Sequence, residues 1–243
     1  ENAQIVVLER SGHVSFANCG LPYYIGDVIT DRDALLLQTP SSLKARFGID
    51  VRVNSEALNI DRGAKSVAVR NMATGEQYSL NYDSLILAPG AAPFVPPIPG
   101  VERALTLRNI ADTDEMAAAV DAALARPEPT AVIMGGGFIG VELAENLTER
   151  GLKVTIVELA DQLLAPLDVE MAALVEKHLV KQGVGVITGA SVTEVCADSV
   201  ALSTGVVLPA DLVVAAIGVR PETGLAEAAG LELGERGGIL VDD

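Results

Sequence analysis

The sequence has 243 residues, of which 49% are hydrophobic and 21% are charged, and its formal net charge at pH 7 is −16. This balance is typical of a globular protein with one large domain or two small ones, and it excludes a largely disordered chain. The acidic charge repels phosphate backbones, and no apolar run approaches the roughly 20 residues that span a membrane. Neither a nucleic acid nor a membrane is therefore an expected partner.

In the first hundred residues, apolar and β-branched runs between turn residues predict mainly strands. A helical pattern over residues 33–47 is interrupted near Pro40. Four prolines between Pro93 and Gly100 cannot continue a helix or a central strand, so they indicate a stiff connector and a domain boundary near residue 101. The expected strands are residues 4–8, 51–60, 66–70, 78–80 and 85–88, the middle three antiparallel.

Beyond the connector, strand-like and helix-like segments alternate. This order predicts an α/β fold of the Rossmann type, in which a parallel sheet is covered on both faces. Asp112 or Thr113 is the expected cap of the first helix, and Cys196 is expected to be packed in the interior. The expected helices are residues 112–125, 138–150 and 168–182, the strands are 130–134, 153–157, 185–188 and 212–217, and residues 192–195 and 199–202 form a hairpin.

A glycine motif, G-x-G-x-x-G, lies between the strand at 130–134 and the helix that follows it. Gly135 permits a tight turn, Gly137 lets the backbone approach a pyrophosphate, and Gly140 lets helix and strand pack closely. The next strand ends in Glu158, close to the spacing expected for an acid that binds the adenosine ribose of NADH. The motif predicts a dinucleotide site; the alternative is a glycine-rich turn that binds nothing.

The first strand ends in Glu9 and Arg10, which resembles a second ribose-binding strand end without its glycine motif. The alternative is an ordinary strand end with a solvated pair of charges. Cys19 lies between Asn18 and Gly20, and a helical segment after Pro22 favours a reactive thiolate at its N-terminus. The alternative for a lone cysteine is a small buried apolar residue. His13 and His178 lack the partner spacing of metal ligands, so no metal site is expected.

Two cysteines are too few for a disulfide scaffold and indicate a reducing compartment, so we expect a cytoplasmic protein. The chain begins at Glu1 within a few residues of an apolar run and ends just after another such run. Both ends are expected to be cuts through structure, which makes the chain a fragment of a longer protein.

Five stretches together carry a resemblance to a known family. They are SFANCGLPYYIG from Ser15, LILAPGA from Leu85, PPIPG from Pro96, GGGFIGVE from Gly135 and AIGVRP from Ala216. The chain resembles the pyridine nucleotide–disulfide oxidoreductases, and its cysteine stretch is most similar to coenzyme A disulfide reductases, CoA-dependent NADH oxidases and persulfide or polysulfide reductases.

The resemblance implies an organisation for the chain. Residues 102–222 would be an NAD(P)-binding domain inserted in a partial FAD-binding domain of the glutathione-reductase type, formed by residues 1–101 and the start of a returning segment at 223–243. Intact members are about twice as long and carry an N-terminal FAD phosphate loop and a C-terminal dimerisation domain. A homodimer is therefore implied for the full-length protein, with a small CoA disulfide as substrate.

The resemblance also implies residue roles. Cys19 would be the redox nucleophile that receives electrons from NAD(P)H through FAD, and Ser15 and Asn18 would line the thiol pocket. Glu142 would lie near the nicotinamide, or else be a solvated helix acid, and Phe138 would gate that pocket or belong to the core. The implied cofactor-binding residues are Glu9, Arg10, Ala88, Gly90, Gly135, Gly137, Phe138, Ile139, Gly140, Glu158 and Gly218.

Two other functions compete with this interpretation. The first is an NADH oxidase or peroxidase that cycles Cys19 through a sulfenic acid. The second is a non-catalytic dinucleotide-binding module, because without the FAD phosphate loop this chain is expected to bind FAD weakly and to be inactive alone. The physiological disulfide and the choice between NADH and NADPH stay open, beyond the NADH preference that Glu158 suggests.

Overall fold

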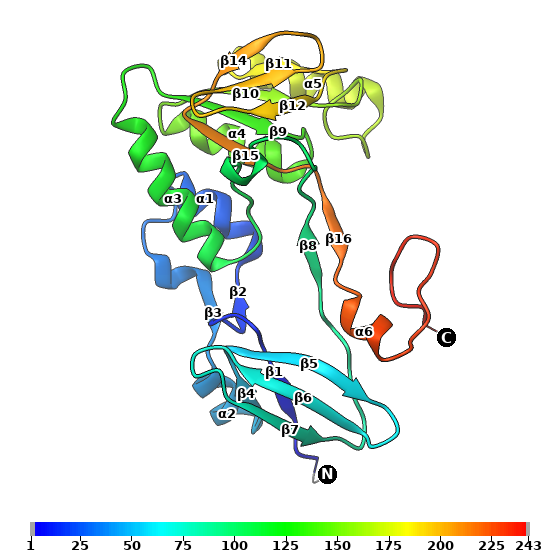
Figure 1. Ribbon diagram of the computed structural model, residues 1–243. Coiled ribbons are helices and arrows are strands. Elements are labelled where there is room, and N and C mark those ends of the chain that lie inside the picture. The colour runs from blue at the N-terminus through cyan, green and yellow to red at the C-terminus, as the bar shows by residue number, and fades with distance from the viewer. Residues whose placement is uncertain (1–2, 242–243) are drawn as a thin grey trace. The chain divides into compact units, whose positions relative to one another are not determined.

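The computed structural model describes residues 3–241 (Figure 1). The chain divides into two compact units. Unit 1 consists of Glu1–Ala17, Leu36–Ala92 and Arg220–Asp243, and unit 2 consists of Asn18–Leu35 and Pro93–Val219. Between residues 3 and 241 no helix has the length and apolar character to cross a membrane.

Unit 1 is built on small sheets. β1 (Val6–Leu8) pairs in parallel with β4 (Asp50–Arg52), and β2 (Ser15–Phe16) pairs antiparallel with β3 (Leu36–Gln38). Ile60, Val67 and Val69 form the buried centre of a third sheet, which is antiparallel as expected. That sheet consists of β5 (Ser55–Asp61), β6 (Ser66–Asn71) and β7 (Gln77–Asn81); the helices of the unit are α2 (Pro40–Phe47) and α6 (Gly224–Ala228).

Three predictions in this part of the chain are wrong. The strand expected at 51–60 is two strands, because β4 ends at Arg52 and pairs in parallel with β1, and β5 begins at Ser55 after Asn54, whose φ is +51°. Residues 85–88 form no strand: within residues 3–241 no ladder partner reaches them, and Ile86 is 89% exposed. The predicted helix 33–47 is a 3-10 turn (Arg32–Leu35), the strand β3 and then α2. Thr39 explains why the α-helix begins only at Pro40: its side chain and that of Ser42 form a capping box, and proline suits the first turn of a helix.

Unit 2 contains the expected parallel sheet, in the order β11-β10-β9-β15. Its central strand, β9 (Thr130–Met134), pairs with β10 (Lys153–Val157) and with β15 (Leu212–Ala215), and β11 (Gly185–Ile187) lies at the edge. The helices α3 (Ile110–Leu124), α4 (Phe138–Glu149) and α5 (Val169–Lys181) begin and end within two residues of their predicted bounds. The α/β fold is confirmed, although Asn109 and not Asp112 or Thr113 caps α3.

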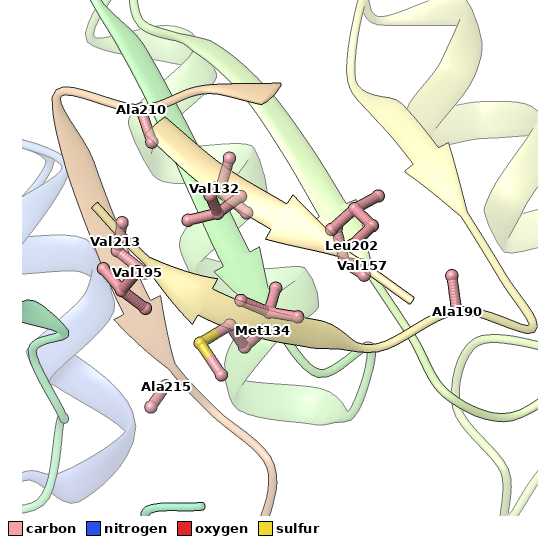
Figure 2. Packing of buried hydrophobic residues seen from close by; sticks show 11 residues of the cluster. Val132, Met134, Val157, Ala190, Val195, Leu202, Ala210, Val213 and Ala215 are labelled. Atoms are coloured by element: carbon pink, nitrogen blue, oxygen red, sulfur yellow. The ribbon is translucent and has the colours of Figure 1, made fainter. Parts of the chain in front are cut away.

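One face of the parallel sheet packs against an antiparallel sheet of β12 (Val192–Val195), β13 (Ser199–Leu202) and β14 (Val207–Pro209). Figure 2 shows Val132 and Met134 of β9 beside Val195 and Leu202. Alternate residues of β9 point to the opposite face, where Ile133 lies under α4. Cys196 follows β12 and is exposed, so its expected interior packing is wrong.

The segment that carries Cys19 belongs to unit 2, although it follows β2 of unit 1 directly in the sequence. It comprises a 3-10 turn (Asn18–Gly20), α1 (Leu21–Ile25) and the 3-10 turn Arg32–Leu35. α1 packs against α3 and α4. The remaining elements are a 3-10 turn (Val101–Arg103) and the two-stranded sheet of β8 (Ala91–Pro93) and β16 (Val219–Pro221).

Candidate functional site

The glycine motif forms a turn between β9 and α4 that tolerates few side chains. Gly135 has φ +105°, and a Cβ there would lie 2.5 Å from the carbonyl oxygen of Ala216. A Cβ on Gly140 would overlap the carbonyl oxygen of Gly135. Both glycines therefore let the first turn of α4 lie directly against the ends of the sheet strands.

Gly137 differs from its neighbours because its surroundings are open. A Cβ there would have no atom of the described chain within 4 Å, and the backbone has an ordinary φ of −77°. Gly137 is the N-cap of α4, and across the described residues no side chain caps this helix end. The start of α4 thus offers backbone N–H groups and the positive end of a 12-residue helix to an anion. Phe138 and Ile139, in the first turn, are 59% and 40% exposed.

The carboxylate of Glu158 is hydrogen-bonded to the same turn. The backbone N–H of Gly136 donates to Glu158 Oε2 at 2.6 Å, and that of Ala160 donates to Oε1 at 2.7 Å. A Cβ on Gly136 would overlap Leu163 Cδ2, so a larger residue at the middle position of the motif would require the Leu163 side chain to move. The motif pattern leaves this position free, so sequence reasoning missed both Gly136 and the contact that orients Glu158.

Glu142 lies one turn into α4 in a half-buried position. Burial, and secondly the negative charge of Glu145, raise the pKa of Glu142 above its ordinary value of 4.5. The folded state therefore binds this proton more tightly than the unfolded state does. As pH rises through the raised pKa, the charged form is disfavoured and stability is lost; below the ordinary value both states are protonated and no cost remains.

We expect Glu142→Gln to raise the melting temperature slightly at neutral pH, because it removes this unfavourable charge. The gain should disappear well below pH 4.5, where the wild-type carboxyl is also neutral. Thermal unfolding of both proteins, from neutral pH to well below pH 4.5, measures this difference in melting temperature. Glu115→Gln, at an exposed position within α3, controls for the substitution itself and should leave the melting temperature close to that of the wild type. A Glu142→Gln variant that is no more stable than wild type at neutral pH contradicts the prediction.

Cys19 is exposed in the turn before α1, and the neighbouring Gly20 is buried. Asn18 Oδ1 accepts a hydrogen bond from Arg108 Nη1 at 3.5 Å, which places a cationic side chain beside this turn. Sequence reasoning missed Arg108, because it lies 90 residues further along the chain. Asn18 and Cys19 share unit 2 with the glycine motif and with Gly218, which follows β15 with φ +101°. Ser15 lies in unit 1, in β2 opposite Gln38.

The other predicted residues of unit 1 lie at strand ends and in loops. Glu9 follows β1, and its Oε1 accepts the backbone N–H of Ser11 at 2.7 Å. Arg10 forms an exposed ion pair with Glu222 at 3.5 Å. The carbonyl of Gly90 accepts the backbone N–H of Glu222 at 3.0 Å, and Ala88 is exposed. Their expected roles in binding a flavin nucleotide stay predictions.

The whole chain, residues 1–243, matches the family described as pyridine nucleotide-disulphide oxidoreductase. An NADH oxidase of Enterococcus faecalis is 34% identical over 92% of this chain and 50% of its own length. A coenzyme A disulfide reductase of Staphylococcus aureus is 31% identical over 100% of this chain and 55% of its own. The chain thus spans about half the length of the curated relatives it matches.

Solved structures also match the chain over nearly its whole length. Reduced Bacillus anthracis CoADR-RHD is 47% identical, with a TM-score of 0.92, over 96% of this chain and 42% of that protein. An NAD-dependent persulfide reductase from A. fulgidus is 37% identical, also with a TM-score of 0.92, over 99% of this chain and 46% of that protein. These likenesses extend over both compact units.

Proposed function

The chain belongs to the pyridine nucleotide-disulphide oxidoreductase family, and we propose that the polypeptide containing it reduces CoA disulfide or CoA persulfide with NAD(P)H and FAD through Cys19. The observation that carries the proposal is the position of this cysteine. Its thiol is exposed in a turn of the same compact unit that holds a complete dinucleotide motif. The similarity to a coenzyme A disulfide reductase and to a persulfide reductase supports the substrate class.

The residues of unit 2 fit a dinucleotide. The uncapped start of α4 and the open surroundings of Gly137 suit a pyrophosphate, because backbone N–H groups can bind it without a side chain intervening. A carboxylate has about four acceptor sites, so Glu158 can hold Gly136 and Ala160 and still bind a ribose hydroxyl. We place NAD(P)H here, and the exposed apolar Phe138 and Ile139 beside its reactive end.

The residues of unit 1 are compatible with part of a flavin site. Glu9 at the end of β1 has acceptor capacity beyond its bond to Ser11, as an adenosine ribose needs. We propose that Glu9 and Arg10 contact this ribose and that Ala88 and Gly90 lie along the flavin. When bound, NAD(P)H supplies a hydride, and FAD passes the electron pair on toward sulfur.

The chemistry assigned to Cys19 is thiol–disulfide exchange. Its thiolate attacks one sulfur of CoA disulfide, the S–S bond breaks, and one CoA thiolate leaves. The product is a mixed disulfide between Cys19 and the second CoA. Two electrons that originate in NAD(P)H then cleave this bond, and one proton from water accompanies release of the second CoA thiol and return of the Cys19 thiolate. Asn18, next to Cys19 in unit 2, would orient the bound thiol, and the role expected of Ser15 stays a prediction.

A substrate comparison tests the proposal. The complete polypeptide, loaded with FAD, is given NADH together with CoA disulfide, CoA persulfide, oxygen or hydrogen peroxide in turn. We expect the sulfur substrates to be consumed fastest. Faster turnover with oxygen or peroxide would instead favour an NADH oxidase or peroxidase, a second candidate that the similarity to the Enterococcus faecalis NADH oxidase supports. No turnover with any of the four would favour a non-catalytic dinucleotide-binding module.

Glu158 gives a prediction about the nucleotide. We expect Glu158→Gln to bind NADH about tenfold more weakly and to prefer NADH over NADPH less, because a carboxylate binds the ribose hydroxyls and repels a 2′-phosphate. Affinity titrations with both nucleotides measure the change. Glu170→Gln, at an exposed acid in the first turn of α5, should leave both affinities unchanged. An unaltered NADH-to-NADPH ratio in the Glu158 variant contradicts this assignment.

We also propose that the complete polypeptide is a cytoplasmic homodimer, as the family resemblance implies. The two cysteines support a reducing compartment. Light scattering coupled to size-exclusion chromatography of the complete polypeptide determines whether it is a dimer.

A further inference from the structure

Residues Asn18–Leu35 are here called the cysteine segment. Besides the bond from Arg108 to Asn18, two further arginine side chains join this segment to the rest of unit 2. Its only α-helix, α1, has five residues and no side-chain cap among the described residues. Such a short helix is unstable alone, so its position depends on contacts with its neighbours. These neighbours are α3 and α4, and α4 is the helix that starts at the glycine motif.

The first arginine is Arg150, at the C-terminal end of α4. Its Nη1 donates to the carbonyl oxygen of Ile25 at 2.9 Å, and its Nη2 bonds Asp121 of α3 at 2.7 Å. The side chain is only 17% exposed. Ile25 is the last residue of α1, so Arg150 satisfies a carbonyl that the helix itself leaves without a partner.

The same face of α4 also fits the end of α1 closely. Asn146, one turn before Arg150, is 2% exposed and donates from Nδ2 to the carbonyl of Glu142 at 2.8 Å. A Cβ on Gly26 would overlap the Asn146 side chain. Glycine at this position therefore lets the end of α1 lie directly on α4, within reach of Arg150.

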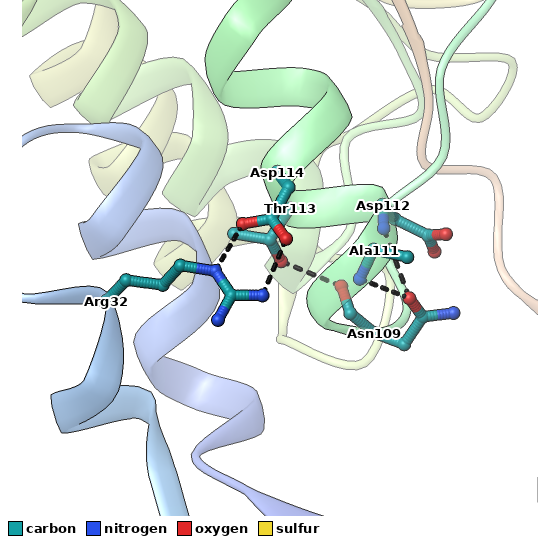
Figure 3. Close-up of polar contacts among 6 residues, drawn as sticks. All are labelled: Arg32, Asn109, Ala111, Asp112, Thr113 and Asp114. Carbon is teal, nitrogen blue, oxygen red and sulfur yellow. Dashed lines mark hydrogen bonds and ion pairs between the residues drawn. The ribbon is translucent and has the colours of Figure 1, made fainter. Parts of the chain in front are cut away.

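The second arginine is Arg32, near the end of the cysteine segment. Its Nε and Nη2 donate to Asp114 Oδ1 and Oδ2, both at 2.7 Å, as Figure 3 shows. This two-point geometry fixes orientation as well as distance. Hydrogen bonding to Asp114 outweighs partial burial and raises the pKa of Arg32, so the cation is retained.

Asp114 lies near the start of α3, which is capped by Asn109. Asn109 Oδ1 accepts the backbone N–H groups of Ala111 and Asp112 at 2.8 and 3.1 Å (Figure 3). Thr113 is fully buried and donates its hydroxyl to the Asn109 carbonyl at 2.8 Å. Arg32 thus bonds to α3 just after its capped and packed first turn.

We propose that Arg32 and Arg150 are positioning residues that fix the cysteine segment, and with it Cys19, on unit 2. The proposal rests on the redox role given to Cys19 above. Each arginine acts on the thiol through the backbone of the segment. A displacement of about 1 Å in a reacting group can cost on the order of a hundredfold in rate, so loosening the segment should impair the chemistry and spare nucleotide binding.

The test compares Arg32→Met, Arg150→Met and the exchanged pair Arg32→Asp with Asp114→Arg in the complete polypeptide. We expect each single variant to lower kcat for the CoA substrate about tenfold, with the NADH dissociation constant unchanged. The exchanged pair should recover much of the kcat that Arg32→Met loses. Arg126→Met is the matched control, because Arg126 pairs at 3.2 Å with Asp211, a residue of unit 2 outside the cysteine segment. It should behave as wild type.

A second readout does not depend on activity. Alkylation of Cys19 is followed by mass spectrometry, with the exposed Cys196 of the same chain as internal reference. We expect the Cys19-to-Cys196 rate ratio to change at least about threefold in both single variants and to return in the exchanged pair. Unchanged ratios together with unchanged kcat overturn the positioning role. If the wild type reduces no CoA substrate, the proposed function fails, and the alkylation ratio alone decides whether the two arginines position the segment.

Discussion

Replacement of Cys19 by serine in the complete polypeptide is expected to lower turnover of CoA disulfide and CoA persulfide by about a thousandfold or more. A serine hydroxyl is not ionised at neutral pH and forms no mixed disulfide, so the step that cleaves the S–S bond is lost. NADH binding should persist, because the glycine motif and Glu158 do not involve this residue. NADH consumption with each sulfur substrate measures the effect.

Cys196→Ser is the matched control for this substitution. Both cysteines are exposed and both lie in unit 2, yet Cys196 follows a strand of the antiparallel sheet, outside every motif discussed above. The control should retain wild-type turnover. Intact-mass analysis after CoA disulfide treatment should show a CoA adduct that is lost in Cys19→Ser and kept in Cys196→Ser. Undiminished sulfur reduction by the Cys19 variant would falsify the mechanism.

Unit 2 could be predicted largely from the sequence because its signals are local. The glycine motif, a buried strand before it and an apolar helix after it specify one βαβ unit within about thirty residues. The antiparallel pair at 192–195 and 199–202 is likewise confirmed. Residues 199–202 alternate between partly buried and buried positions, whereas a register shift between Val192 and Glu194 breaks the alternation in the first strand. In each case neighbouring residues decide the structure.

The contacts of the cysteine segment could not be predicted in this way. Arg32 and Asp114 are 82 residues apart, and Arg150 is 125 residues from Ile25. Each arginine taken alone fits a solvated surface charge, which is the ordinary state of that residue type. The position of Cys196 was also mispredicted from the sequence. Its apolar neighbours suggested burial, but the strand ends at Val195 and Cys196 lies exposed just beyond it. The strand expected at 85–88 is absent for a related reason. An apolar run becomes a strand only where another strand bonds to it, and the run itself does not reveal whether such a partner exists.

Two glycines of one motif are expected to respond differently to the same substitution. Gly137→Ala should keep the stability of the wild type, because its φ of −77° suits alanine and the described chain leaves the space around it open. It should nevertheless bind NADH at least about tenfold more weakly, since the added methyl group stands where a pyrophosphate must approach the backbone. Nucleotide titration and thermal unfolding of the complete polypeptide measure the two quantities.

Gly140→Ala should lower both quantities, because its Cβ would overlap the carbonyl oxygen of Gly135, and backbone cannot move aside as a side chain can. Such overpacking costs about 1–3 kcal/mol in the free energy of unfolding. Gly224→Ala, at another open position with an unstrained backbone, should alter neither and controls for the substitution itself. If Gly137→Ala bound NADH as tightly as wild type, the open space at the start of α4 would not be where the pyrophosphate lies. An equal loss of stability in both motif variants would instead mean that the motif serves packing alone, which is the alternative that sequence patterns leave open.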